Sequence, residues 1–416
     1  RESPALWSKF FRELMTTMGF CVSRSEPSVF KHSELDVTVI VHVDDLFIFG
    51  LDDHVSKFII ELQTHVKSSV PSYLRKSGDK VLMLGRTITQ TARGFVVCTD
   101  DKHCRQVVEE MQSWSSKQLR VTAVPGRKFS SIELDVLAAK LEPQRHEVYR
   151  RNVGRLIDCS LDRPDLMYSI KCLAQDLSSP SEASWSTLMQ LAAYLQGKES
   201  VFLRVEVECD SQGNPPNTVH CYADSDWAGN QTRKSTSGGV ILWGSTPLGF
   251  WSRGQSSFAM SSCEAELYAS ITACAEGLYT SSLLNELGWL TKVVVHTDSS
   301  SALSMMQRPG SSRPMRHIEI KYLYLQDLVA RGVISAQKIG TKSNPADLLT
   351  KVPTREMLDS FLSMYCVSTA SAVDASSGRA VQAKKVVPQV NYVFSMKCSC
   401  PLCSRIRANL GLHQVY

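Results

Sequence analysis

The stretch TVHCYADSDWAG, residues 218–229, decides the fold of the second half of the chain. Its apolar and β-branched residues predict a β-strand over 218–223, and Asp224 follows that strand directly. Strands and helices then alternate, which indicates an α/β layer fold. The elements predicted next are strands at 238–243 and 248–252, a helix at about 261–287, a strand at 292–297, helices at 299–307 and 317–331, a strand at 333–339 and a helix from about 344.

Four acidic residues of this half stand at predicted strand ends or on helices. Asp224 follows the first strand, Asp298 ends the strand KVVVHTD, and Asp347 opens the last helix in SNPADLLTK. Glu266 lies within the long helix. Singly, Asp298 and Asp347 could be helix N-terminal acids, and Glu266 a solvated residue. Together, four acids facing one crevice would repel one another, and cations would relieve that repulsion.

Divalent cations also give such a set a chemical use. In phosphodiester hydrolysis one Mg²⁺ activates water and a second, roughly 3.5–4 Å away, stabilises the leaving oxygen. Mg²⁺ prefers oxygen ligands and keeps several waters, so a few carboxylates from separate elements suffice. The acids therefore predict Mg²⁺, or Mn²⁺, as the cofactor.

A series of motifs runs through residues 218–360: YADSDWAGN, RKSTSGGVILWG, FWSRGQSSFAMSSCEAELYA, LLNELG, HTDSSSAL, RHIEIKY and NPADLLTK. In content and order they resemble the ribonuclease H domain of copia-type LTR retrotransposons. The resemblance implies a mixed five-stranded sheet with flanking helices, and cleavage of the RNA strand of RNA–DNA hybrids. The catalytic, metal-binding acids that it implies are Asp224, Glu266, Asp298 and Asp347.

Further residues near these motifs are lesser candidates. The family pattern Glu-Leu-x-Ala selects Glu266 over Glu264, because residues two apart on a helix do not share a face. Asp226 lies two residues after Asp224, where it would support the metal ligands. Many ribonucleases H place a histidine before the last acid, but IGTKSNPAD has none, and we expect a capping or core role for His317.

The turn after the first strand carries Arg233, Lys234 and Ser235, which we expect to contact nucleic-acid phosphates. A solvated turn without ligand is the alternative. Recognition of the hybrid would rest on backbone shape and the RNA 2′-OH rather than on base sequence.

The first half contains VTVIVHVDDLFIFG, residues 37–50, which predicts a buried hairpin with Asp44 and Asp45 near its turn. Adjacent carboxylates in an apolar run are costly unless a metal or water reaches them. As a plain turn, Asp-Asp would be unremarkable. Its flanks include KVLMLGRTI, YRRNVGRLIDCSLDRPDLMYSI and WSTLMQLAAYLQGK. Together they resemble the Tyr-x-Asp-Asp hairpin and its surroundings in copia-type reverse transcriptases, over about residues 3–205, which implies that Asp44 and Asp45 are metal ligands by descent.

Two departures from the polymerase pattern matter. His42 stands where the family has tyrosine, and the family's third catalytic aspartate belongs to segments upstream of those present. We therefore expect the chain not to polymerise DNA by itself, and we interpret its opening Arg1-Glu2-Ser3-Pro4 as that of a cut fragment or processed product.

The predicted organisation is a partial reverse-transcriptase palm at 1–114, a helical connection at 115–208, a ribonuclease H domain at 218–360 and a disordered tail at 365–416. The tail contains Cys398, Cys400, Cys403 and His413. Zinc can bind three thiolates and one imidazole, but Cys-x-Cys-x2-Cys is not a standard finger spacing. Exposed, incidental cysteines are the alternative.

Composition limits the partners. The 416 residues carry a formal charge of +5, which is compatible with nucleic acid, and no run approaches the roughly 20 apolar residues of a membrane helix. Mostly scattered cysteines indicate a reducing compartment. The retrotransposon resemblance implies the cytoplasm (virus-like particle) or the nucleus. Expected partners are the hybrid, nucleic-acid backbone and the rest of the Pol polyprotein. A domesticated fragment that binds nucleic acid without catalysis, or a structural subunit, is the alternative.

Overall fold

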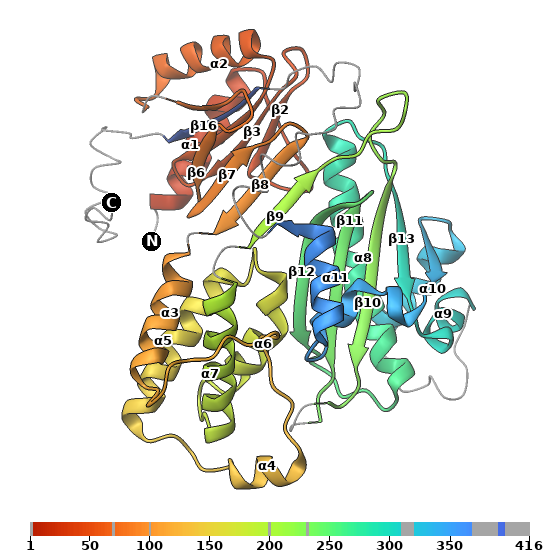
Figure 1. Cartoon of the computed structure of the whole chain (residues 1–416). Coiled ribbons are helices and arrows are strands. Elements are labelled where there is room, and N and C mark those ends of the chain that lie inside the picture. Colours follow the sequence, from red (N-terminus) through yellow and green to blue (C-terminus); the bar gives the residue numbers. More distant parts are fainter. Residues whose placement is uncertain are drawn as a thin grey trace. The chain divides into compact units, whose positions relative to one another are not determined.

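The computed structural model describes residues 3–68, 71–99, 101–198, 201–229, 233–308, 320–367 and 390–395 (Figure 1). They form two compact units, which we describe separately. The first unit contains the described residues as far as Ala92, together with Ser282–Gly288 and Val390–Ser395, and the second contains the others.

The first unit is built on a sheet with the strand order β1-β2-β3-β4-β16-β5. Its elements are α1 (Ser3–Thr17), β1 (Cys21–Val22), β2 (Val29–His32), β3 (Val37–His42), β4 (Asp45–Gly50), α2 (Asp52–His65), β5 (Ser72–Leu74), the hairpin of β6 (Lys80–Met83) and β7 (Arg86–Gln90), and β16 (Val390–Ser395). Buried side chains of both helices, such as Phe11 and Phe58, pack with Ile48 of β4 in one core. The predicted hairpin at 37–50 is confirmed as β3 and β4, with His42 opposite Asp45.

Strand β16 corrects part of the prediction of a disordered tail. It pairs antiparallel with β4, from Val390 opposite Gly50 to Ser395 opposite Asp45, and also with β5. Without it the edge of β4 would be unpaired, and the apolar segment VNYVFS satisfies those backbone groups. A second short strand, β15 (Cys366–Val367), lies at the start of the predicted tail, whose other residues fall outside the described ranges.

The second unit holds two groups of elements. The first group is β8 (Gly94–Thr99), α3 (Lys102–Ser113), α4 (Ser131–Val136), α5 (Pro143–Cys159), α6 (Pro164–Gln175), α7 (Glu182–Gly197) and β9 (Phe202–Glu206). The second group is β10 (Thr218–Asp226), β11 (Thr236–Trp243), β12 (Thr246–Gly254), α8 (Ser262–Glu286, of which the residues from Ser282 onward are assigned to the first unit), β13 (Lys292–Thr297), α9 (Ser300–Gln307), α10 (Ile320–Ala330), β14 (Ile334–Lys338), the short 3₁₀ helices η2 (Thr341–Ser343) and η3 (Pro345–Leu349), and α11 (Arg355–Tyr365).

The sheet of the second group has the order β12-β11-β10-β13-β14. Strands β10, β11 and β12 pair antiparallel, whereas β13 pairs parallel with both β10 and β14. The parallel step from β10 to β13 needs a long crossover, which contains α8. This is the mixed five-stranded sheet with flanking helices that the sequence predicts for a ribonuclease H-like fold. Every residue of β11, an interior strand between β12 and β10, is buried, as expected for a strand covered on both faces.

Two predicted boundaries and one missing strand need correction. Strand β10 continues to Asp226, so Asp224 lies inside the strand rather than after it. The predicted helix from 344 is instead η3, and α11 begins only at Arg355, since Pro353 cannot continue a helix and Thr354 caps the next one. Strand β9 at Phe202–Glu206 was not predicted, and it pairs with β8 and β15.

The connection helices share one hydrophobic core with this sheet. Leu156 of α5 and Tyr194 of α7 belong to the same buried cluster as Leu349 of η3. Helix α6 begins at Pro164, whose fixed φ suits the first helical position. Within the described ranges, no helix combines the length and the apolar composition needed to cross a membrane.

Candidate metal centre

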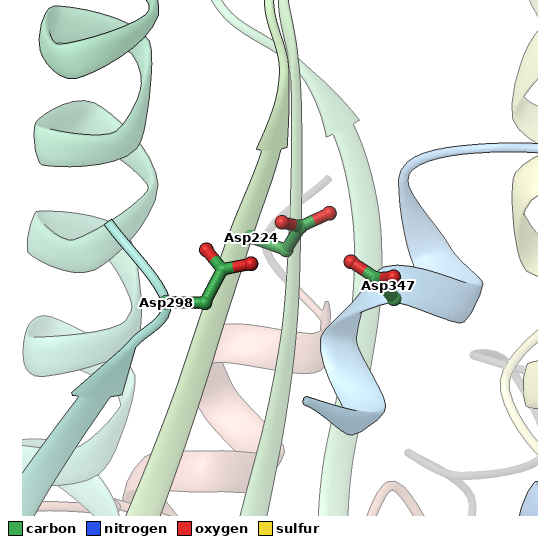
Figure 2. A group of neighbouring side chains, drawn as sticks. All are labelled: Asp224, Asp298 and Asp347. Atoms are coloured by element: carbon green, nitrogen blue, oxygen red, sulfur yellow. The ribbon is translucent and has the colours of Figure 1, made fainter. Parts of the chain in front are cut away.

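Three of the predicted acids come together at one end of the five-stranded sheet (Figure 2). Asp224 projects from β10, Asp298 directly follows β13, and Asp347 lies in η3. One carboxylate oxygen from each lies within 4.8 Å of the others. Asp224 and Asp347 are buried, and Asp298 is partly exposed. Residues more than a hundred positions apart in sequence therefore converge on one small volume.

Glu266, the fourth predicted acid, faces the same site from α8. The Ser225 backbone N–H and hydroxyl donate to its Oε1, at 3.2 and 2.9 Å. It is not part of the 4.8 Å group, but its charge acts on Asp224. Among the described residues, the buried Oε2 of Glu266 and the buried Oδ1 of Asp347 have no hydrogen-bond partner. Such oxygens are costly unless another group binds them.

A glycine lets η3 approach the sheet beside Asp224. Gly238 of β11 pairs with Asp224. A Cβ at this position would lie 2.7 Å from Cγ2 of Thr350 and 2.9 Å from the carbonyl oxygen of Ala346. Any larger residue would push η3, and therefore Asp347, away from the strand.

Hydrogen bonds then fix η3 to β10. The Asn344 side chain donates to the carbonyl of Ala223 at 2.9 Å and accepts from the Ala346 N–H at 3.2 Å. The Thr350 hydroxyl, also buried, donates to the carboxylate of Asp224. The segment of η3 and Thr350 thus carries Asp347 and also orients Asp224.

The carboxylates perturb one another's ionisation. Burial raises the pKa of Asp224 to about 8, and the charges of Glu266 and Asp347 add to the shift. Burial also raises the pKa of Glu266 to about 7. The hydrogen bonds from Ser225 lower this pKa, whereas the charge of Asp298 raises it further. Like charges in a shielded site disfavour ionisation, so a bound cation would favour the charged forms.

Two lysines lie at the rim of this group. Lys351 Nζ is 2.7 Å from Oδ2 of Asp347. Lys338 binds instead the main-chain oxygen of Asp298, and the Ser300 hydroxyl at 2.7 Å. The donor set is thus made of carboxylate oxygens, two of them without partners, which fits a hard divalent cation such as Mg²⁺ or Mn²⁺.

The lesser candidates lie outside the group. Glu264 is buried, but it accepts hydrogen bonds from the Met260 N–H at 2.7 Å and from the Tyr268 hydroxyl. Asp226 is half-buried; burial raises its pKa, and Lys171 opposes the shift.

The basic turn has a more restricted geometry than the sequence suggests. Arg233 is exposed, with a φ of +57°. Lys234 Nζ lies 5.8 Å from the centre of the Phe258 ring. Ser235 is buried, and its hydroxyl accepts from the Ala228 N–H at 3.2 Å. The predicted phosphate contact therefore needs correction at Ser235, because its side chain already holds the turn and does not reach solvent.

The Asp44–Asp45 pair forms a different kind of site. It lies at the tight turn between β3 and β4, where Val43 has a φ of +55° and is 66% exposed. The indole N–H of Trp7 donates to the Val43 carbonyl at 2.6 Å. Among the described residues, neither aspartate belongs to a group of three or more side chains that could share a metal ion.

Some sequence predictions fall outside the described ranges: His317 and the possible zinc ligands Cys398, Cys400, Cys403 and His413. Conversely, the sequence analysis did not identify Asn344, Thr350 or Lys351 as part of the site. A signal for Lys351 was present, because it stands four residues after Asp347, the spacing that brings two side chains together on a helical turn.

Comparison with known proteins identifies the chain's relatives. No family model matches it. The retrovirus-related Pol polyprotein from transposon RE2 of Arabidopsis thaliana is 26% identical over 368 residues, which cover 87% of this chain and 24% of that protein. The chain is homologous to transposon Pol polyproteins. A further Pol relative, from transposon TNT 1-94 of Nicotiana tabacum, is 24% identical over 86% of the chain and 27% of its own length. The resemblance to the C-terminal part of copia-type Pol is thereby confirmed, and the chain spans about a quarter of the length of these relatives.

Solved structures are less similar to this chain than the Pol polyproteins are in sequence. The ribonuclease H1 called LC11, isolated from compost, is 21% identical over 35% of the chain and 99% of its own length, with a TM-score of 0.27. A foamy viral protease-reverse transcriptase in complex with an RNA/DNA hybrid is 13% identical over 66% of the chain and 30% of its own length, with a TM-score of 0.34. The fold assignment rests on the strand order rather than on these scores.

Proposed function

We propose that the chain carries a Mg²⁺-dependent ribonuclease H that cleaves the RNA strand of RNA–DNA hybrids, within a retrotransposon reverse-transcriptase polyprotein. The observation that supports this most is the convergence of Asp224, Asp298 and Asp347 on one volume beside Glu266. Two of these four side chains present a buried oxygen that has no hydrogen-bond partner among the residues described. An acidic cluster in this state is suited to binding divalent cations.

The chain's own residues would divide the work. Asp224, Asp298 and Asp347 would hold the cations, together with Glu266. When bound, such ions activate water and stabilise the leaving oxygen of a phosphodiester.

The surrounding side chains would position these ligands and the substrate. Thr350 orients Asp224 by its hydrogen bond, and Ser225 orients Glu266. Arg233, which is exposed, and Lys234 would contact phosphates of the hybrid near the site.

The hybrid as substrate is part of the proposal. Among the structural neighbours, LC11 ribonuclease H1 has been solved in complex with an RNA/DNA hybrid. We place the activity in the cytoplasm (virus-like particle) or the nucleus, alongside the rest of Pol and with no membrane partner. In the first unit, Asp44 and Asp45 would be inherited polymerase ligands, and we expect no DNA synthesis by this chain alone.

The experiment is a cleavage assay with a hybrid labelled on either strand. We expect the wild-type chain to cut only the RNA strand, to need Mg²⁺ or Mn²⁺, and to stop when EDTA is added. Asp298→Asn should bind the hybrid but not cut it, whereas Asp327→Asn, which changes an exposed acid paired with Arg331, should cut normally.

Two other outcomes define the alternatives. Binding of the hybrid without cleavage, equal in wild type and Asp298→Asn, would instead indicate a non-catalytic nucleic-acid-binding fragment. A purely structural subunit would have its carboxylates dispersed or neutralised by Lys or Arg. Within the described part of the chain, Asp347 is the only one of the clustered acids in an ion pair, with Lys351, and this favours the enzymatic proposal.

A further inference from the structure

Lys351 occupies an unusual position for a basic residue. Its ammonium group lies 2.7 Å from Oδ2 of Asp347, whose side chain is only 9% exposed. The charges of Asp224 and Asp298 also act on this ammonium group, and one oxygen from each of the three aspartates lies within 4.8 Å of the others. The nearby Lys338 donates to main-chain and hydroxyl oxygens instead.

The two carboxylate oxygens of Asp347 therefore have different surroundings. One of its oxygens, Oδ2, is held by Lys351, and the other, Oδ1, is buried without a hydrogen-bond partner in the ranges that the structure describes. A divalent cation that approaches Oδ1 meets the positive charge of Lys351 a few ångströms away, and the repulsion is considerable at low effective dielectric. The Lys351 side chain is 41% exposed, so it has room to move into solvent.

We propose that Lys351 is a built-in counter-ion of the metal centre: it neutralises Asp347 in the metal-free protein, competes with divalent cations for that carboxylate, and so lowers the affinity of the site. The inference rests on the proposed function, because it assumes that the cluster binds metal. Lys351 is a positioning residue here, since it acts through Asp347.

Calorimetric titration of the full-length chain with Mn²⁺ tests this without any nucleic acid. Lys351→Met should bind Mn²⁺ about tenfold more tightly than wild type at low salt, because a neighbouring positive charge has been removed. The same variant should melt at a lower temperature than wild type in EDTA, since three acids then lack their cation. Added salt should reduce the gain in affinity.

Two variants serve as controls. Lys342→Met removes an equal charge from an exposed residue of η2, and it should bind Mn²⁺ as wild type does. Lys351→Arg keeps the charge and should also remain close to wild type. If Lys351→Met unfolds, Lys351→Gln, which keeps a polar side chain, replaces it in the titration.

The outcomes distinguish the counter-ion role of Lys351 from the existence of the metal centre itself. Unchanged or weaker Mn²⁺ binding in Lys351→Met, relative to Lys342→Met, would overturn the counter-ion role while leaving the metal centre in place. Absence of Mn²⁺ binding in wild type and in every variant would overturn the proposed function and the inference together.

Discussion

The two acidic sites of the chain bring their carboxylates together in different ways. Asp44 and Asp45 are neighbours in sequence, and they meet at a tight turn next to a valine with a φ of +55°. Asp224, Asp298 and Asp347 come from three separate elements and are brought together by a sheet. The first site contains backbone strain, and the second contains charge repulsion.

This difference indicates what each site needs in order to be complete. A strained valine at the tip of a hairpin is tolerated where the surroundings enforce it, and such strain clusters at functional sites. Among the described residues, however, no third acid joins Asp44 and Asp45 in a possible metal site. In the second site three aspartates share one small volume, and burial raises the pKa of Asp224 to about 8. We therefore expect only the second site to bind metal by itself.

Activity gives the largest expected contrast. Asp298→Asn should lower hybrid cleavage by roughly a thousandfold, because one ligand and its charge are lost from the centre. Asp45→Asn, measured in the same assay, should stay within about twofold of wild type. A loss of cleavage in Asp45→Asn as large as that in Asp298→Asn would show that the two sites are not independent.

Stability against pH tests the repulsion directly. The pKa of Asp224 is raised, to about 8, so the folded state holds its proton more tightly than the unfolded chain. Its contribution to stability is complete below about pH 4 and is lost as the pH rises through about 8. In EDTA, Asp224→Asn should therefore be more stable than wild type at pH 8, by on the order of 2 kcal/mol, and the difference should shrink towards pH 5.

Chemical denaturation at several pH values measures this difference. Mg²⁺ should stabilise wild type more than the variant. A difference in unfolding free energy that does not vary with pH would rule out unfavourable ionisation of Asp224 as its source.

Disturbing the packing of η3 against β11 should change the unfolding free energy by a similar or smaller amount than Asp224→Asn does. Gly238→Ala places a methyl group 2.7 Å from Thr350 and 2.9 Å from the Ala346 carbonyl, so it should destabilise the chain by about 1–3 kcal/mol. It should also weaken Mn²⁺ binding, because Asp347 moves with η3. Gly154→Ala is the matched control: it lies in α5 with nothing within 4 Å of the added carbon, and it should stabilise slightly. Equal effects of the two substitutions would contradict the close-approach explanation.

The smallest effect is expected at the strained turn of the first site. Val43→Gly removes the left-handed strain but adds backbone entropy to the unfolded chain, so a net gain of less than about 1 kcal/mol should result. Val136→Gly, an exposed valine in α4, should instead lower stability. A loss of stability in Val43→Gly, measured by denaturant midpoint, would mean that Val43 is not strained.

Sequence periodicity located most elements because their burial follows local pattern. The hairpin at 37–50 and the strand at 292–297 were both predicted. The strands that the sequence analysis missed are those whose formation depends on pairing with segments far away in sequence. Strand β9 forms through pairing with β8 and β15, and β16 forms on the edge of β4 from more than 300 residues away.

At the candidate site, the sequence by itself determined which acids are present and the strands and helices on which they lie. A carboxylate, a β-branched run and a helical period are local properties of the chain. Tertiary structure decided how those acids act on one another. Only folding places Gly238 beneath η3, puts Thr350 on Asp224, leaves Oδ1 of Asp347 without a partner and brings Lys351 onto its other oxygen. Burial and mutual repulsion depend on distances through space, and these are fixed by the sheet register and the packing of η3 rather than by any stretch of sequence.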